Sequence, residues 1–477
     1  MNQEEARQYK KMILTPPGKL IFTLAVPTVV SMLITMIYNL VDAYFVGKLG
    51  KSASAAIGIV MSFQTVFQAF GFMYGQGSGS KVARLLAVGK KDEADRILTL
   101  GIAASFISGL ILMLLGLIFI NPLIHLMSTD TIFPYAKTYA LYIIISGPVL
   151  SVSCVLNNVM RYEGRAFFAM FGLVSGGVLN MILDPILMFG FGMEIRGAAI
   201  ATMVSQFLSL GILLYMFLSH RTISSISLKY LKLPFGEIAS SVFDIVKTGF
   251  PSLLRQLCAT LSTSILNIVS KPFGDAAMAA MTIDGRVLMF IGSTMIGIGQ
   301  GFQPVSAFNY GSKKFKRLKR ACFVTWRAGT LLMAVLAVLG FIFAADVIRM
   351  FVEDEEIELV VHYGVPALRF MCIAVVVQPA SVVGNMLFQS IGDSRKASFL
   401  SMLRSGLCYI PLLILLPPFM GFLGIQCSQM VADILSAIIS VPFVVKFLKS
   451  IPSEDISTVQ DEKYAEFIKG KEGSAGA

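Results

Sequence analysis

The sequence predicts an all-α membrane protein with 12 transmembrane helices in two six-helix lobes. Three observations predict this fold: a very apolar composition, twelve apolar stretches, and two halves that repeat each other. Of the 477 residues, 56% are hydrophobic and only 14% are charged, whereas a soluble domain carries about 25% charged residues. So few charges could not cover the surface of a soluble protein of this length. The composition therefore excludes ordinary soluble enzymes, disordered proteins and nucleic-acid-binding proteins.

Twelve stretches are long enough to cross a bilayer, which requires about 20 mostly apolar residues. They lie at 20–47, 53–79, 97–120, 135–160, 166–190, 197–219, 245–271, 277–304, 321–344, 361–390, 398–420 and 422–447. Lys and Arg crowd into alternate connections, and the positive-inside rule then places both termini in the cytoplasm. The net charge of +11 is therefore assigned to membrane orientation rather than to nucleic-acid binding.

The longest internal connection divides the chain into two lobes. We expect a cytoplasmic N-terminus (1–19), an N-terminal lobe (20–219), a cytoplasmic linker (220–244), a C-terminal lobe (245–447) and a disordered cytoplasmic tail (448–477). The tail is predicted to be disordered because it contains few aromatic residues.

The second half repeats the Gly and Pro pattern of the first. At an offset of 224 residues, Pro27 aligns with Pro251, and the Gly-Gln-Gly tripeptide at 75–77 aligns with the same tripeptide at 299–301. Each repeat holds an even number of spans, so both halves cross the membrane in the same direction. Such parallel repeats are related by a pseudo-two-fold axis along the membrane normal. This architecture is typical of a transporter that alternates access to its central cavity.

Two aspartates lie inside apolar stretches of the first half. Asp42 and Asp184 are each about five or six residues, or roughly 8 Å, from the outer end of their spans. Asn180 shares the helical face of Asp184 because it precedes it by four residues, and Thr202 reaches the same depth from the next span. Two carboxylates in a low dielectric cannot both stay ionised cheaply, so one binds a proton or the pair binds a small cation. We therefore predict a cation-coupling site for H⁺ or Na⁺ at these four residues.

Pro27 interrupts the first span before Asp42. A proline inside a helix introduces a kink that can act as a hinge. We predict that ion binding at Asp42 changes the bend at Pro27, with a static kink as the alternative.

The second half lacks the acid pair, because Leu266 and Ile410 stand at the matched positions. The charged residues in or near its spans are Arg255, Asp284, Arg286, Arg369, Arg404 and Asp433. They are expected either to form ion pairs between helices or to contact substrate. The residues predicted to line a substrate cavity are Tyr38, Asn39, Asn157, Met160, Arg255 and Asp284.

An ordered set of motifs resembles the multidrug and toxic compound extrusion (MATE) family. The set comprises Val-Asp-Ala-Tyr-Phe-Val-Gly at 41–47, the tripeptide at 75–77, Asn180 with 184–185, and Gln-Pro followed by Asn-Tyr-Gly within 303–311. The resemblance covers about residues 15 to 450. Within the family, the sequence is most similar to the prokaryotic branch of DNA-damage-inducible and staphylococcal-type multidrug pumps.

The resemblance implies a function and a site. It implies a drug antiporter whose cation site is formed by Asp42, Asn180, Asp184 and Thr202, with Pro27 as the bending proline. Some family members carry further acids in the seventh and tenth spans. This chain has Arg255 and Arg369 there, so we do not expect a second acidic cation site in the C-terminal lobe.

These observations together predict an ion-coupled multidrug efflux antiporter of the inner (plasma) membrane. We expect it to export organic, mostly cationic drugs by alternating access, as a monomer, with no cofactor besides the coupling ion and no nucleic-acid partner. The alternative is a flippase of the same superfamily for lipid-linked oligosaccharides or polysaccharides, because its arginines could bind phosphate. An enzyme is not expected, since the sequence has no Walker A, H-E-x-x-H or G-x-S-x-G motif.

Overall fold

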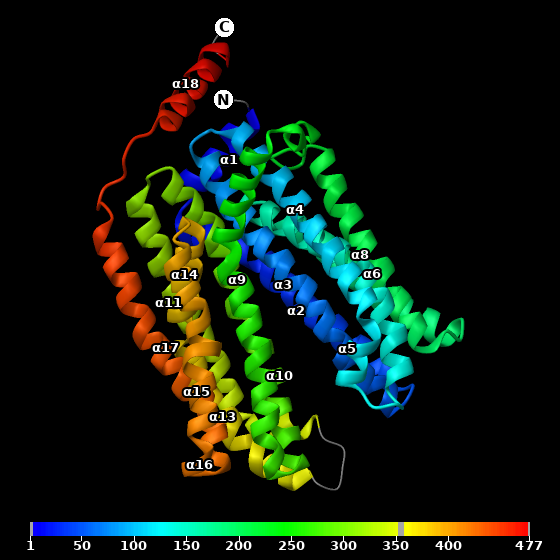
Figure 1. Cartoon of the computed structure of the whole chain (residues 1–477). Coiled ribbons are helices and arrows are strands. Elements are labelled where there is room, and N and C mark those ends of the chain that lie inside the picture. The colour runs from blue at the N-terminus through cyan, green and yellow to red at the C-terminus, as the bar shows by residue number, and fades with distance from the viewer. Residues whose placement is uncertain (1–2, 352–356, 476–477) are drawn as a thin grey trace. The chain divides into compact units, whose positions relative to one another are not determined.

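The computed structural model describes residues 3–351 and 357–475, and within these ranges it is built of helices without a β-strand (Figure 1). The helices, including short 3₁₀ and π segments labelled η, span Gln3–Tyr9 (α1), Lys10–Leu14 (η1), Pro17–Gly47 (α2), Lys51–Ala87 (α3), Lys91–Ile118 (α4), Ile120–Met127 (α5), Phe133–Tyr162 (α6), Ala166–Pro185 (α7), Ile186–Gly190 (η2), Glu194–Leu218 (α8), Leu228–Lys232 (η3), Phe235–Ser270 (α9), Lys271–Phe273 (η4), Asp275–Gly311 (α10), Phe315–Ile342 (α11), Ala344–Arg349 (α12), Ile357–Ile391 (α13), Ser394–Met402 (α14), Leu403–Cys408 (η5), Tyr409–Leu415 (α15), Pro417–Met420 (α16), Phe422–Ser450 (α17) and Val459–Ala475 (α18).

Eleven helices in the described ranges are long and apolar enough to cross a membrane. They correspond to eleven of the twelve predicted stretches. The remaining stretch, 245–271, lies in α9, which has 36 residues but is not among the eleven. Ser, Thr, Arg and Gln side chains interrupt its apolar sequence, so α9 is long enough to cross a bilayer but less apolar than the eleven.

The internal repeat is visible in the backbone. The second helix of each repeat, α3 and α10, has 37 residues. Each follows a glycine with positive φ, Gly50 at 114° and Gly274 at 92°, a conformation that favours glycine because it lacks Cβ. Asn157 donates to the carbonyl of Ala169 at 2.8 Å, and Asn385 donates to the carbonyl of Ala397 at 3.0 Å. The two repeats therefore share both helix order and buried hydrogen bonds.

The chain divides into two compact units whose boundaries cut through helices. One unit comprises residues 1–14, 30–253 and 458–477, and the other comprises 15–29 and 254–457. The first halves of α2 and α9 are thus exchanged between the repeats. In each helix the division falls two residues after the proline, at Val29 after Pro27 and at Leu253 after Pro251. The lobes predicted at 20–219 and 245–447 do not include this exchange.

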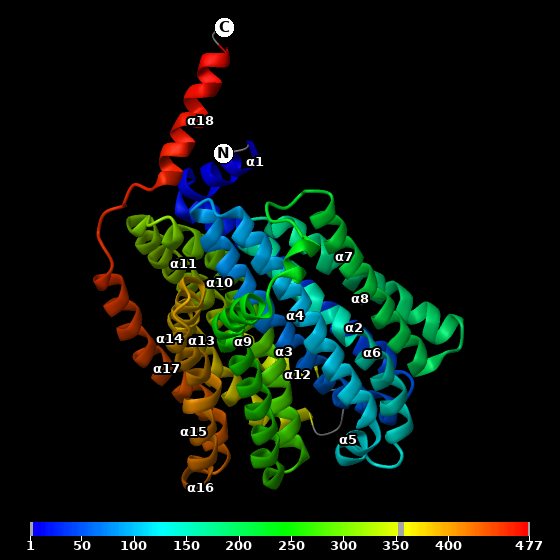
Figure 2. The same cartoon turned by 45° about the horizontal axis from the view of Figure 1, so that its top comes forward.

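Each unit is built around one central helix. In the first unit α6 packs against α3, α4 and α8, and α7 runs beside α8 (Figure 2). Within the membrane-spanning window of α6, 72% of the residues are buried. In the second unit α13 occupies the matched position and packs against α10, α11 and α17. Of the two candidate acids of the first half, Asp184 lies on α7, which packs against both α6 and α8, and Asp42 lies on α2.

The exchanged half-helices are seated on glycines. A Cβ added to Gly77 of α3 would lie 2.1 Å from the carbonyl oxygen of Ile245 in α9. In the other unit, a Cβ on Gly301 of α10 would lie 2.6 Å from the backbone of Ala25 in α2. The second glycine of the repeated Gly-Gln-Gly tripeptide is thus required for the close approach of helix backbones.

Two acids, Glu163 and Asp95, accept hydrogen bonds from the linker that follows α8. Glu163, at the end of α6, accepts hydrogen bonds from the backbone N–H groups of Ile223 and Ser224, at 2.8 and 2.9 Å. Burial raises the pKa of the Glu163 carboxyl, and these hydrogen bonds oppose that rise. Asp95 accepts from both the backbone and the hydroxyl of Ser225. The predicted linker at 220–244 is therefore ordered, and α9 begins inside it at Phe235.

The expected disordered tail differs from the structure, which has a helix, α18, in the described part of 448–477; residues 476–477 lie outside the described ranges. The carboxylate of Asp461 accepts from the backbone N–H of Thr458, three residues earlier, which is one of the two hydrogen bonds of a capping box. The Tyr9 hydroxyl also donates to Asp461, and the ring of Tyr9 lies 5.3 Å from that of Tyr464. The scarcity of aromatic residues that predicted disorder does not take account of these capping and tertiary contacts.

Candidate functional site

The two buried aspartates of the first unit are joined by a chain of hydrogen-bonding side chains. The Tyr139 hydroxyl donates to the Asp42 carboxylate at 3.1 Å and lies 3.5 Å from the Thr202 hydroxyl. The Asn180 amide donates to the Thr202 hydroxyl at 3.3 Å and to the Asp184 carboxylate at 3.2 Å. Four helices, α2, α6, α7 and α8, each contribute at least one of these residues. The structure thus brings the four residues predicted for the cation site into one network.

The end of α7 positions Asn180 and Asp184. Asp184 is the penultimate residue of the helix, and Pro185 follows it. Proline has no N–H, so it leaves a carbonyl of the preceding turn without its helical partner. The chain continues as the π-helical turn η2, against which Gly197 of α8 packs closely. This irregular turn ends the helix where the two polar side chains face α8.

Three oxygens of this network are left without a hydrogen-bond partner among the described residues: Asp42 Oδ1, Asn180 Oδ1 and Asp184 Oδ2. Their residues are almost inaccessible, with exposed fractions of 8%, 2% and 0%. A buried oxygen without a partner is costly. A proton or a hard cation would satisfy these oxygens, because both favour carboxylate and amide oxygens. The residues present therefore fit the predicted coupling ion.

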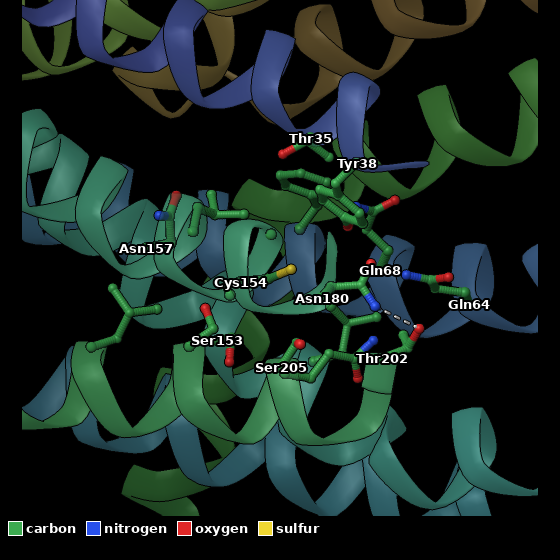
Figure 3. Close-up of a pocket in the computed structure, with 18 of the residues that line it drawn as sticks. Thr35, Tyr38, Gln64, Gln68, Ser153, Cys154, Asn157, Asn180, Thr202 and Ser205 are labelled. Atoms are coloured by element: carbon green, nitrogen blue, oxygen red, sulfur yellow. Dashed lines mark hydrogen bonds between the residues drawn. The ribbon is translucent and has the colours of Figure 1, made fainter. Parts of the chain in front are cut away.

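A cavity of about 110 Å³ borders this network (Figure 3). Asn180 and Thr202 line one side of it, and Asn157 lies toward the other side. The lining also includes Tyr38 and Gln64 and contains no Asp, Glu, Lys or Arg. A water molecule occupies about 30 Å³ in the liquid, so the cavity holds a few waters. Drug-sized pockets measure about 300–1,000 Å³, so in this conformation the cavity is a small recess beside the acids, lined by both apolar and neutral polar side chains.

The structure places the six predicted substrate-cavity residues in different surroundings. Tyr38 and Asn157 line the cavity described above. Asn39 and Arg255 are partly buried on α2 and α9 and do not line it. Met160 and Asp284 are fully buried, at 0% exposure, so neither faces an open cavity in this conformation.

Tyr139 is the residue of the network that sequence reasoning missed. It lies six residues after the start of α6, which enters the membrane from the same side as α8. The depth argument that selected Thr202 therefore applies equally to Tyr139. A tyrosine in an apolar helix is ordinary on its own, and only its hydroxyl contact with Asp42 marks it.

The charged residues of the second unit are arranged differently. Arg404 Nε lies 2.7 Å from Asp433 Oδ1, and Gln429 donates to the same oxygen at 2.9 Å. Arg369 is exposed and lies over the ring of Phe341, 5.1 Å from its centre. The expected ion pair between helices is therefore present for Arg404 and Asp433.

Comparison with known families identifies the chain. The family model described as MatE matches residues 27–186 and 251–415, which begin at Pro27 and at Pro251 of the two repeats. The chain belongs to the MatE family. The predicted resemblance is thereby confirmed, and this MatE protein is a multi-pass membrane transporter rather than an enzyme.

Individual relatives agree with this assignment. The chain is similar to Multidrug export protein MepA of Staphylococcus saprophyticus, with 27% identity over 87% of this chain and 90% of that protein. Its fold is similar to a crystal structure of MATE in complex with MaL6, with a TM-score of 0.87, 24% identity, and coverage of 93% and 98%. It is also similar to a Pyrococcus furiosus MOP superfamily transporter with a binding pocket of reverse polarity that suggests a different function, with a TM-score of 0.86, 24% identity, and coverage of 93% and 98%. The predicted all-α membrane fold is confirmed.

Proposed function

We propose that this MatE transporter is a cation-coupled multidrug exporter of the plasma membrane. The observation that carries the proposal is the buried network from Asp42 to Asp184, with its three oxygens that lack partners. The similarity to Multidrug export protein MepA supports drugs as the exported class.

Ion binding changes the charge of a dry site. A proton on Asp42 or Asp184, or a Na⁺ between them, removes one negative charge where water cannot screen it. The hydrogen bonds of Tyr139, Thr202 and Asn180 transmit that change across α2, α6, α7 and α8. Coupling follows when the protein conformation that binds the ion more tightly differs from the one that binds drug.

Pro27 is the proposed hinge of this response. It lies inside α2, on the same helix as Asp42, and two residues before the point where the helix passes from one compact unit to the other. A change of bend at this proline moves the first half of α2 relative to the half that carries Asp42. A static kink predicts instead that Pro27→Ala leaves transport unchanged.

Cationic organic compounds are the proposed substrates, with both termini of the chain in the cytoplasm. The Asp42 and Asp184 carboxylates attract a cation while they are ionised and release it when protonated. The neutral amides and hydroxyls beside them, such as Asn157 and Gln64, offer hydrogen bonds without selecting one chemical structure. This combination suits a broad range of substrates better than a single one.

The test is efflux of ethidium from energised vesicles in which the proton and sodium gradients are collapsed separately. Wild-type efflux should depend on one of the two gradients, which names the coupling ion. Asp42→Asn should lower gradient-driven efflux by roughly 10- to 100-fold, because a hydrogen bond to a charged group contributes about 1.5–3 kcal/mol. The matched control is Asp130→Asn, an exposed aspartate. Full efflux by Asp42→Asn would refute the coupling role.

The flippase alternative is tested in the same preparation. A lipid diphosphate requires cationic side chains, and one of the candidates, Arg404, is already paired with Asp433. This pairing favours organic cations over phosphates as ligands. Binding of a lipid diphosphate to the purified protein, without binding of ethidium, would favour the flippase.

A further inference from the structure

Among the described residues of the second unit, Asp284 is a buried acid that the proposed mechanism does not use and that has no partner. Asp284 lies on α10, nine residues after the helix begins at Asp275, which is about 14 Å along the helix axis. Its exposed fraction is 0%, and neither of its carboxylate oxygens has a hydrogen-bond partner among the described residues. In this respect it differs from Asp433 of the same unit, which has both Arg404 and Gln429.

The surroundings of Asp284 are apolar. Its neighbours in sequence, Ala280 and Ile283, belong to a buried hydrophobic cluster together with Leu368 and Cys372 of α13. A Cβ on Gly340 of α11 would lie 2.9 Å from the Cys372 sulfur, so this corner of the unit is tightly packed.

Other charged side chains on the helices packed around Asp284 are exposed, except for Arg317 and Lys319 at the start of α11, which are partly buried. The exposed ones on α10, α11, α12 and α13 include Arg286, Arg327, Asp346, Arg349, His362 and Arg369. An ionised carboxylate in such surroundings would have neither water nor a countercharge, and a buried acid in that position binds a proton instead. The geometry therefore describes a neutral carboxylic acid.

The first repeat shows that the fold does not require an acid at this position. At the offset of 224 residues Asp284 matches Val60, which is buried at 2% exposure. Gly116 packs against Ile144 in the first repeat, just as Gly340 packs against Cys372 in the second. Where the first unit has Val60 and Ile144, the second has Asp284 and Cys372. An aliphatic residue thus fills the same place without burying an unsatisfied carboxyl.

We propose that Asp284 is a second proton-carrying carboxyl, held neutral in this conformation and deprotonated in another step of transport, in contrast to the sequence-based expectation of no second acidic cation site in the C-terminal lobe. A buried carboxyl without hydrogen bonds destabilises this conformation relative to a valine. Ionisable residues inside membrane-spanning helices are costly and mark functional sites by default. Once water reaches Asp284, the acid can release its proton, whereas a valine has no proton to release. This exchange during transport rests on the proposed export function, whereas the neutral state of the acid does not.

The first experiment measures the bound proton directly. Infrared spectra of the purified protein in lipid are recorded in H₂O and D₂O, and the carbonyl stretch of protonated carboxylic acids is compared between variants. Asp284→Asn should lose the band of one protonated carboxyl at neutral pH. The matched control, Asp346→Asn, removes an exposed acid of α12 and should lose none. An unchanged band in Asp284→Asn would overturn the proposal.

The second experiment tests proton exchange in proteoliposomes loaded with ethidium. Asp284→Asn should either reduce the number of protons moved per ethidium by about one or lower pH-driven transport by at least about tenfold, while Asp346→Asn matches the wild type. Asp284→Leu, which is apolar like its surroundings, should give the same defect and covers the case in which the Asn variant does not fold. Wild-type proton counts and rates in a folded Asn or Leu variant would overturn the exchange. Absence of ethidium transport by the wild type would refute the export function and leave the infrared result to decide the protonation state.

Discussion

The two repeats of this transporter share a scaffold but not their chemistry. Each has a proline-bearing first helix whose halves belong to different compact units, and a second helix of 37 residues with a Gly-Gln-Gly tripeptide. The first repeat joins Asp42 to Asp184 by hydrogen bonds. The second has aliphatic residues at those positions, an ion pair between Arg404 and Asp433, and an isolated acid.

This difference shows that a duplicated backbone constrains packing more strongly than polar function. Glycines recur at 77 and 301, where helix backbones approach closely and a side chain would collide with a neighbouring main chain. Polar side chains need only a buried position, and each repeat has filled such positions differently. Predictions that compare matched positions can therefore separate residues that hold the scaffold from residues that carry ions.

The largest expected effect is the loss of the ion pair in the second repeat. Asp433→Asn should destabilise the protein by about 3 kcal/mol, because it leaves the Arg404 charge without its partner in a mostly buried site. The double variant Arg404→Met with Asp433→Leu should recover most of that stability, since it removes both charges. Unfolding in detergent, followed by circular dichroism, measures both. Equal destabilisation of the single and double variants would show that packing, rather than charge, matters at this position.

A smaller effect on stability is expected from exchanging the matched residues where α9 crosses α3 and where α2 crosses α10. Gly249 of α9 matches Ala25 of α2, yet a Cβ on Gly249 would lie 1.7 Å from the carbonyl oxygen of Met73. Gly249→Ala should therefore cost about 2–3 kcal/mol of unfolding free energy by overpacking. The reverse change, Ala25→Gly, should cost only about 1 kcal/mol from helix propensity.

The control for the Gly249 variant is Gly47→Ala, because Gly47 has no neighbouring atom within 4 Å of an added Cβ. Thermal unfolding of all three variants in the same detergent makes the comparison. If Gly249→Ala were as stable as Gly47→Ala, position 249 would tolerate a side chain as well as the matched position 25 does. The expected contrast between the two repeats would then be wrong.

The smallest effect concerns Tyr139, which matches the fully buried Ala367 of the second repeat at an offset of 228 residues. Tyr139→Phe removes the hydroxyl that donates to Asp42 and keeps the ring. We expect a loss of about 1 kcal/mol in the coupling network, or roughly a fivefold reduction in gradient-driven ethidium efflux. Expression and unfolding temperature should stay near those of the wild type. Unchanged efflux would place Tyr139 outside the coupling network.

Much of the fold could be predicted from local sequence patterns. Hydropathy located the helices, and the Gly and Pro offsets located the repeat. Depth along the spans placed Asp42, Asn180, Asp184 and Thr202 at one level, and the structure brings them together. The same argument could have found Tyr139, which lies on α6 at about the depth that Thr202 has on α8. The acid three residues after Thr458, which caps the start of α18, was likewise a local signal for that helix.

The sequence by itself determined which residues lie in the membrane and at what depth, because hydrophobicity and helical rise are local properties of the chain. Only the tertiary structure decided which side chains face one another around α6 and α13, because that depends on the rotation and approach of separate helices. The pairing of Arg404 with Asp433 and the isolation of Asp284 both follow from such packing. The division of α2 and α9 between the two units also required the fold, since a proline predicts a kink but not the neighbour of each half-helix.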